Sequence, residues 1–90
     1  DNDGYTPLHI ASSTRQVDTA RLLLQAKANP NTKNNAGNTP LHFTSLCGKL
    51  DTARLLLQFN ADPNTKNKHG KNPLHGAFSP EMKHLLESIM

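Results

Sequence analysis

The chain has 90 residues, a formal net charge of +3 and 34% hydrophobic residues. This length suits a single domain, residues 1–90, near the size at which one hydrophobic core becomes marginal. The small positive charge permits acidic partners without requiring them. The only cysteine, Cys47, excludes an intrachain disulfide and favours a reducing compartment, so we expect an intracellular protein, cytoplasmic or nuclear. The longest aliphatic runs, such as residues 22–24, are too short to insert into a membrane.

A repeat runs through the whole chain. Thr-Pro-Leu-His occupies residues 6–9 and 39–42, and Asn-Pro-Leu-His follows at 72–75, so the step is 33 residues both times. The first two units are identical at 20 of 33 positions. A fixed period of this size predicts stacked repeats that share one continuous core. The expected repeats, of which the last is shortened, are 1–33, 34–66 and 67–90.

The first unit is predicted to contain a short helix, a longer helix and a projecting hairpin. Thr6 before Pro7 is typical of an N-cap followed by proline at the first helical position, and this helix should end near Thr14. The second helix is predicted over residues 18–26. Its apolar stripe, spaced for the inner face of an amphipathic helix, is Val17, Ala20, Leu23 and Leu24.

The second unit repeats this order. Gly48 lies where the chain must turn between the helices, because glycine adopts positive φ at little cost. The second helix is predicted over residues 51–59. The linkers 26–38 and 59–71 are rich in Asn, Lys, Gly and Pro, which predicts outward-pointing hairpins.

The third unit departs from the pattern. Ser79 and Pro80 indicate a new N-cap, and alignment with the second unit requires a deletion of about one residue before Met82. The apolar stripe of this last helix is predicted to be Met82, Leu85, Leu86 and Ile89. A terminal repeat needs a polar outer face, and the residues that fit this capping role are Lys83, His84 and Glu87.

These features resemble the ankyrin repeat over essentially the whole chain. The family pattern combines a glycine, Thr-Pro-Leu-His, a glycine between the helices, paired leucines and an Ala-Asp-x-Asn turn. The matches in the first unit are Asp1, Gly4, Thr6, Pro7, Leu8, His9, Ala11, Leu23, Leu24, Ala28 and Asn31. In the second unit they are Gly37, Thr39, Pro40, Leu41, His42, Gly48, Leu56, Leu57, Ala61, Asp62 and Asn64.

The resemblance implies an all-α solenoid of stacked helix-turn-helix units with projecting β-hairpin loops. It also implies that each Thr-Pro-Leu-His histidine hydrogen-bonds the hairpin backbone. Asn31 and Asn64 correspond to asparagines that brace the hairpin and that resemble substrates of asparaginyl hydroxylation. Arg15 departs from the pattern by replacing the inter-helix glycine, and Lys27 and Asn60 replace the glycine after the second helix.

The first unit has no obvious capping repeat before it. We therefore expect apolar surface at the N-terminal end of the stack, where the second helix of this unit would have no neighbour. The chain also starts at Asp1 rather than Met, which indicates a fragment or a processed chain. Either a longer parent array or an association through this end would cover the surface.

His9, His42 and His75 are the obvious metal candidates, but their spacing predicts a ladder instead of a cluster. Stacked helices lie about 8–10 Å apart, whereas zinc needs nitrogen ligands at about 2.0–2.1 Å. Cys47 has no catalytic base in its repeat, and the sequence lacks paired carboxylates and a glycine-rich phosphate loop. We therefore expect neither an enzyme nor a bound metal or cofactor.

Lys66, Lys68, His69 and Lys71 form a basic stretch. Nucleic-acid binding would need a broader positive face with aromatic side chains among the lysines, so a solvated hairpin tip is favoured.

The predicted function is recognition of a partner protein through the concave face formed by hairpin tips and first helices. Positions that differ between units and face outward are free to contact a partner, and the family resemblance gives their place. They are Asn2, Asp3, Tyr5, Ser13, Thr14, Asn35, Ala36, Asn38, Leu46, Cys47, Lys68, His69 and Lys71. Tyr5 and Leu46 are the favoured anchors, because interface energy concentrates in a few large side chains. Neutral drift at solvent positions explains any single one of them equally well.

The alternative function is structural: a spacer, or a self-stacking segment of a longer array that associates weakly through the uncapped first repeat.

Overall fold

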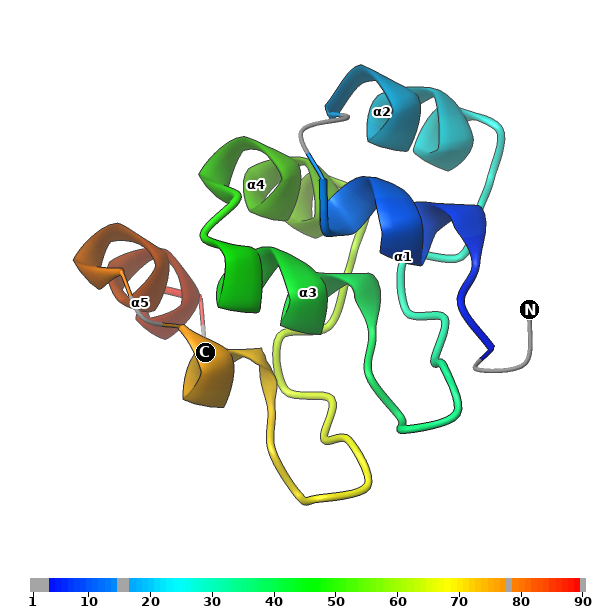
Figure 1. The fold of residues 1–90 in the computed structure, drawn as a ribbon. Coiled ribbons are helices and arrows are strands. Elements are labelled where there is room, and N and C mark those ends of the chain that lie inside the picture. Colours follow the sequence, from blue (N-terminus) through cyan, green and yellow to red (C-terminus); the bar gives the residue numbers. More distant parts are fainter. Residues whose placement is uncertain (1–3, 15–16, 78, 90) are drawn as a thin grey trace.

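The computed structural model describes residues 4–14, 17–77 and 79–89, which form two rows of helices (Figure 1). The first row contains α1 (Pro7–Ser12), α3 (Pro40–Cys47) and the 3₁₀ helix η1 (Pro73–Gly76). The second row contains α2 (Val17–Gln25), α4 (Leu50–Gln58) and α5 (Pro80–Glu87). Loops between α2 and α3 and between α4 and η1 project to one side. The predicted all-α stack of helix pairs is confirmed.

The helices begin where the capping residues predict. Thr6 and Ser79 have extended backbone, and each precedes a proline at the first helical position, where a missing N–H costs nothing. The Ser79 hydroxyl accepts a hydrogen bond from the Met82 N–H at 3.1 Å, so the N-cap predicted for the third unit is confirmed. The two longer helices α2 and α4 begin and end one residue before the predicted bounds.

Helices α2, α3 and α4 are each followed within two residues by a left-handed residue. Gly48 has a φ of 68° at the end of α3, as predicted for the inter-helix turn. Lys27 and Asn60 also have positive φ, 70° and 71°, although neither is glycine. Each lets the following alanine N–H reach back into the last turn of the preceding helix, as in a Schellman motif. A left-handed lysine costs roughly 1–2 kcal/mol relative to glycine. Arg15 lies outside the described residues.

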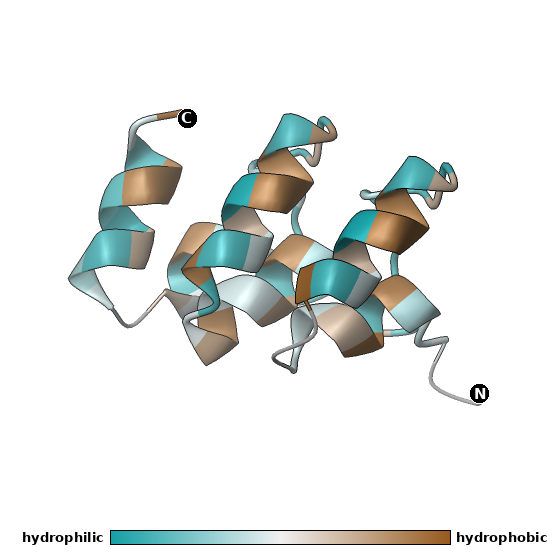
Figure 2. Ribbon diagram, turned by 90° about the horizontal axis from the view of Figure 1, so that it is seen from above, coloured by the Kyte–Doolittle hydropathy of each residue, from teal (hydrophilic) through white to brown (hydrophobic). Residues whose placement is uncertain are grey.

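One continuous core joins the three units. Its buried hydrophobic members come from every unit, and the largest are Leu8, Leu24, Leu41, Leu55, Leu56, Met82 and Leu86. In the first predicted stripe, Ala20 and Leu24 are buried, whereas Val17 and Leu23 are half-buried. Figure 2 shows that α2, α4 and α5 each carry their hydrophobic stretch on the side toward the N-terminal end of the stack. For α4 and α5 that side meets the preceding unit.

The third unit is shorter than predicted. Helix α4 begins 33 residues after α2 (50 minus 17), but α5 begins only 30 residues after α4 (80 minus 50). The predicted deletion of about one residue is therefore wrong: three residues are missing. The first helix of the third unit is also shorter, since η1 has four residues where α3 has eight, and the extended Ala77 follows it.

The last helix has the predicted two-sided character. Met82 and Leu86 are fully buried, and the polar residues of the capping role, Lys83, His84 and Glu87, are exposed. Ile89 lies beyond the end of α5 and is 46% exposed, so it does not extend the apolar stripe as predicted.

The projecting loops turn back on themselves as predicted, but none of the described residues is assigned to a strand. Asn34 N donates to Asn38 O at 3.0 Å, and the Asn34 side chain accepts hydrogen bonds from the backbone inside the same turn. The second loop repeats this arrangement with Asn67. The loops also stack, since Lys68 N donates to Ala36 O at 3.0 Å.

Candidate functional site

The Thr-Pro-Leu-His histidines attach each helix pair to the next loop. His9 Nε2 lies 2.9 Å from Asn38 O, and because a carbonyl can only accept, Nε2 carries the proton. Nδ1 then accepts hydrogen bonds from the backbone N–H and the hydroxyl of Thr6, at 3.0 Å and 2.9 Å. The histidine bond to the hairpin backbone, implied by the ankyrin resemblance, is confirmed here.

His42 repeats this arrangement one unit further along. Its Nε2 donates to Lys71 O at 2.8 Å, and its Nδ1 accepts from Thr39 N at 3.0 Å. Burial lowers the pKa of His9 and of His42 below the usual 6.5, and the accepting role of Nδ1 also favours the neutral ring. In the third unit, Asn72 N donates to His75 Nδ1 at 3.1 Å, but His75 is exposed. His9 and His42 are therefore structural ties, with neutral rings.

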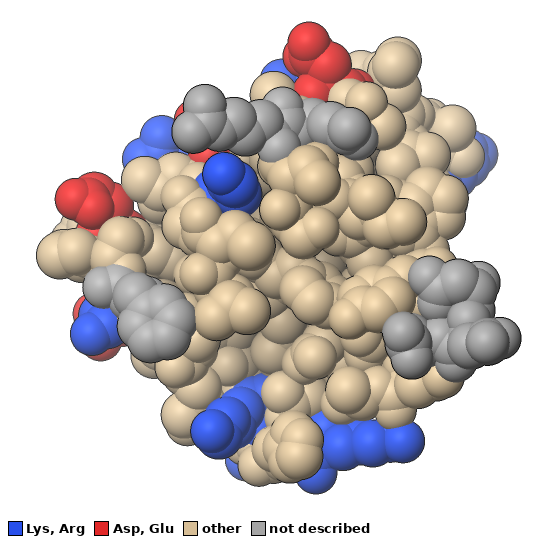
Figure 3. Space-filling model, in the orientation of Figure 1, with Lys and Arg blue, Asp and Glu red and all other residues tan. Residues whose placement is uncertain are grey.

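The face framed by the loop tips and the first row of helices has an uneven charge distribution. Helices α1, α3 and η1 contain no charged residue, and the loop tips 33–38 and 66–71 contain lysines but no carboxylate. The described acidic residues lie on the second row or next to it: Asp18, Asp51, Asp62, Glu81 and Glu87. Figure 3 shows this face, with Asp and Glu at its upper and left edges and with Lys and Arg along its lower edge as well as at its upper left.

A hollow of about 310 Å³ opens on this face between the second and third units. Its apolar walls are Phe43, Leu46, Pro73 and Gly76, and Lys71 lies at its rim. The remaining lining residues are polar: Asn38, His42, Asn67, Asn72 and His75. No acidic residue lines the hollow.

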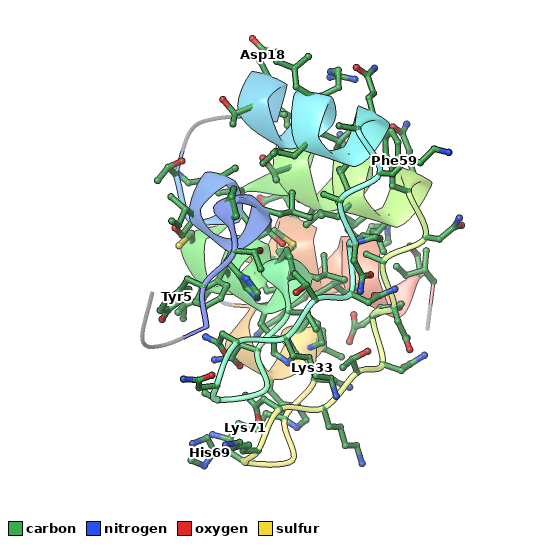
Figure 4. All side chains as sticks on the ribbon, turned by 90° about the vertical axis from the view of Figure 1, so that its right-hand side faces the viewer. Tyr5, Asp18, Lys33, Phe59, His69 and Lys71 are labelled. Carbon is green, nitrogen blue, oxygen red and sulfur yellow. The ribbon has the colours of Figure 1, made fainter. Side chains whose placement is uncertain are left out.

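Tyr5 belongs to an aromatic cluster that spans the first two units. Its ring centroid lies 5.5 Å from that of Phe43 and 5.9 Å from that of His9, and the His9 and Phe43 rings meet edge to face at 5.5 Å. Tyr5 is 37% exposed, so it is held by neighbours while part of its ring faces solvent. Figure 4 shows Tyr5 on the same side of the molecule as Lys71 and His69, with Asp18 at the opposite edge.

The predicted recognition residues fall into three groups. Asn2 and Asp3 lie outside the described residues. The exposed members are Tyr5, Ser13, Asn35, Leu46, Cys47, Lys68, His69 and Lys71, and the half-buried ones are Thr14, Ala36 and Asn38. Leu46 is 55% exposed, the larger exposure of the two favoured anchors. The hollow brings together Asn38 and Leu46 from the second unit and Lys71 from the third.

Asn38 is less free than a recognition position should be. Its side-chain oxygen accepts a hydrogen bond from Asn67 Nδ2 at 2.8 Å, and its carbonyl accepts the bond from His9. It therefore helps to hold the loops together while it lines the hollow.

Sequence reasoning missed Phe43 and Gly76 as parts of this surface. Both occupy the position after Thr/Asn-Pro-Leu-His, where the first unit has Ile10, which is 50% exposed. The contrast of Ile, Phe and Gly at one repeat position was visible in the sequence. What it could not show is that Gly76 faces Leu46.

Asn31 performs the bracing role that the resemblance implies. Its Nδ2 donates to Asn60 O at 3.3 Å, and its Oδ1 accepts from Asp62 N at 2.6 Å, so it ties the first unit to the second. Among the described residues, the third unit ends before the positions that would give Asn64 the same contact.

The N-terminal face of the stack has apolar residues without a neighbouring unit. The octapeptide Asp-Thr-Ala-Arg-Leu-Leu-Leu-Gln occurs in both α2 and α4. Leu22 of α2 is 67% exposed, whereas its counterpart Leu55 in α4, which packs against α2, is 3% exposed. Pro7 is likewise exposed where Pro40 is buried. The preceding unit thus covers residues in α4 that remain open in α2.

Within the described part of the chain, no group of three or more His, Cys, Asp or Glu side chains could hold a metal ion. No helix among the same residues is long and apolar enough to cross a membrane.

Comparison with known proteins agrees with this architecture. A family model described as "Ankyrin repeats (many copies)" matches residues 23–77, and one described as "Ankyrin repeat" matches residues 3–35. A curated relative is Ankyrin repeat domain-containing protein 49 of Drosophila melanogaster, which is 67% identical over 30 residues. That match covers 33% of this chain and 14% of the relative, so the chain spans much less than two thirds of that protein.

Proposed function

Because this chain belongs to the ankyrin repeat family, whose members are generally protein–protein interaction modules, we propose that it binds a partner protein through its concave face. The face consists of the loop tips 33–38 and 66–71 together with α1, α3 and η1. The proposed role is recognition without catalysis.

One observation carries this proposal: the concave face combines large exposed apolar side chains with an uncharged helix row and a lysine-bearing rim. Leu46 is 55% exposed on α3, next to a hollow that enters between two units. Interface energy concentrates in a few large side chains that lie in or near such pockets, surrounded by a polar rim. The second row of helices offers no equivalent combination, because its charged residues include both signs.

The test compares concave-face variants with an outer-face control. A partner is first isolated with the wild-type chain, and its dissociation constant is then measured by calorimetry for each variant. We expect Leu46→Ser and Lys71→Glu to weaken binding, because both residues border the hollow. Lys83→Glu, on the exposed side of α5, is the control and should leave binding unchanged. Unchanged binding by Leu46→Ser and Lys71→Glu together would rule out this surface.

A second candidate function is structural, as a segment of a longer array or as a self-stacking unit. The observation that favours it is the open N-terminal face, where Leu22 is 67% exposed and an apolar hollow of about 290 Å³ lies beside Pro7, Leu8, Leu23 and Ala28. Sedimentation equilibrium of the chain at high concentration tests the self-stacking form. Association that disappears in Leu22→Lys would support it, and a strict monomer would count against it.

A further inference from the structure

The hollow on the concave face exists because the third unit is shortened. In the second unit, α3 has eight residues and ends with Leu46 and Cys47, whereas η1 ends after four. Among the described residues of the third unit, no helical residue corresponds to the last turn of α3. Leu46, in the last turn of α3, is 55% exposed.

Gly76 enlarges the same opening. It occupies the position held by Ile10 and Phe43 in the other units, but it has no side chain. A Cβ built on Gly76 would lie 3.9 Å from Leu46 N and 4.0 Å from Leu46 Cβ, which is ordinary van der Waals contact. A side chain at this position would therefore point at Leu46 and occupy space that is now empty.

The size of the hollow suits one apolar side chain. Enclosed apolar cavities of about 150 Å³ are known to bind benzene, and this open hollow has about 310 Å³. Phe43, Leu46 and Pro73 give it apolar walls. An apolar side chain inserted here would remove both its own surface and the apolar walls of the hollow from water, which favours binding.

The charge around the hollow determines which residues of the partner should flank the inserted side chain. Lys71 lies at the rim, and the loop tip that leads to it adds Lys66, Lys68 and His69. No carboxylate lines the hollow, and the described acidic residues lie on or beside the second row of helices. A partner segment with acidic residues on the loop side would complement this charge, whereas a basic segment would be repelled.

We propose that the hollow binds one large apolar side chain, such as Leu or Phe, from an extended acidic segment of a partner protein. This inference rests on the proposed function and adds the chemistry of the partner. A nucleic acid would also be attracted by the lysines, but stacking of bases needs free aromatic faces. Phe43 is already packed against the rings of Tyr5 and His9, so a protein segment fits the walls better.

The experiment is an unbiased selection. A random 12-residue peptide display library is selected against the immobilised chain, and the recovered peptides are labelled for fluorescence anisotropy. A single-stranded RNA of random sequence is titrated in parallel. Gly76→Leu fills the hollow, and Gly76→Ala is its matched control because it adds only the tolerated Cβ. Lys71→Glu reverses the rim charge, and Lys83→Glu makes the same change on the outer face. Circular dichroism verifies that each variant is folded.

We expect peptides with one large apolar residue flanked by Asp or Glu. Gly76→Leu should weaken their binding by about tenfold or more, because burial of that residue is lost, while Gly76→Ala should have a smaller effect. Lys71→Glu should weaken binding about three- to tenfold at low salt and less at high salt, as expected for an exposed charge pair. Lys83→Glu should change nothing. Should Gly76→Leu fail to fold, Lys71→Glu and its control still decide the outcome.

Three results would overturn the inference. Peptides that bind the concave face but lack acidic residues would refute the partner chemistry and leave the proposed function standing. Recovery of no peptide sensitive to Gly76→Leu or Lys71→Glu would refute the hollow as a binding site, while the partner assay with Leu46→Ser would still judge the concave face. RNA binding that is tighter than peptide binding and lost in Lys71→Glu would assign the surface to nucleic acid.

Discussion

Two leucines in identical local sequences should differ widely in their contribution to stability. Leu22 and Leu55 hold the same position in the octapeptide shared by α2 and α4, so helix propensity and neighbours within that stretch are the same. Only the surroundings differ: Leu22 is 67% exposed and Leu55 is 3% exposed. Replacing each by alanine therefore measures the energy of stacking one unit on another.

The expected magnitudes follow from these exposures. Leu55→Ala removes a buried side chain and leaves a cavity, which costs about 2–5 kcal/mol. Leu22→Ala removes a side chain that is mostly in water, so its cost should be about 0.5 kcal/mol or less. A 90-residue domain has a total stability of roughly 5–13 kcal/mol. The buried substitution thus removes a large share of the stability, and the exposed one removes little.

Urea unfolding followed by circular dichroism provides the measurement. With a slope of about 1–2 kcal/mol/M, the midpoint for Leu55→Ala should fall by about 1 M or more. The midpoint for Leu22→Ala should barely move at low protein concentration. Equal losses for the two variants would refute the claim that stacking, instead of local helix formation, buries this position. A loss for Leu22→Ala that grows with protein concentration would indicate that a second copy covers the N-terminal face.

Two further predictions concern the loops and the histidines. Gly37 and Gly70 both have positive φ, 79° and 73°, but a Cβ on Gly37 would lie 3.0 Å from Lys68 N whereas one on Gly70 would meet nothing within 4 Å. Gly70→Ala should lower the free energy of unfolding by about 1–2 kcal/mol through backbone strain alone. Gly37→Ala should lower it by at least about 1 kcal/mol more through overpacking. Equal urea midpoints for the two variants would contradict the stacking of the loops. Burial lowers the pKa of His9 and His42 in the folded chain, so the unfolded chain binds protons first as the pH falls below 6.5. The free energy of unfolding should therefore be highest above pH 6.5 and should fall as the pH is lowered from 7.5 to 5.5. A urea midpoint that stays level or rises as the pH is lowered would show that the rings are not held neutral.

Much of the fold could be predicted because the same sequence pattern recurs along the chain, and each copy indicates the same local structure. Thr6 and Ser79 before proline located helix starts, and Gly48 located a turn that requires positive φ. The ankyrin resemblance also supplied the bond from His9 to the Asn38 carbonyl across 29 residues, a contact that spacing alone does not indicate. These features depend on backbone geometry within one unit and its immediate neighbour.

The candidate site was less predictable. Leu46 and Lys71 were expected to face a partner, but the hollow beside them depends on the missing three residues of the third unit and on Gly76 facing Leu46. The alignment with the second unit underestimated the deletion before Met82, because Met82, Leu85 and Leu86 fit a helical stripe in more than one register. Only the packed positions of α4 and α5 determine which register the core accepts.

The amino-acid sequence determined the period, the helix pairs, their caps and the residues able to form a core, since each follows from local backbone preferences repeated in register. The tertiary structure alone decided which copy of a repeated residue is covered and where a concave hollow opens. Leu22 and Leu55 cannot differ by any local rule, because burial is a property of the neighbour that stacks on a surface and not of the segment that presents it.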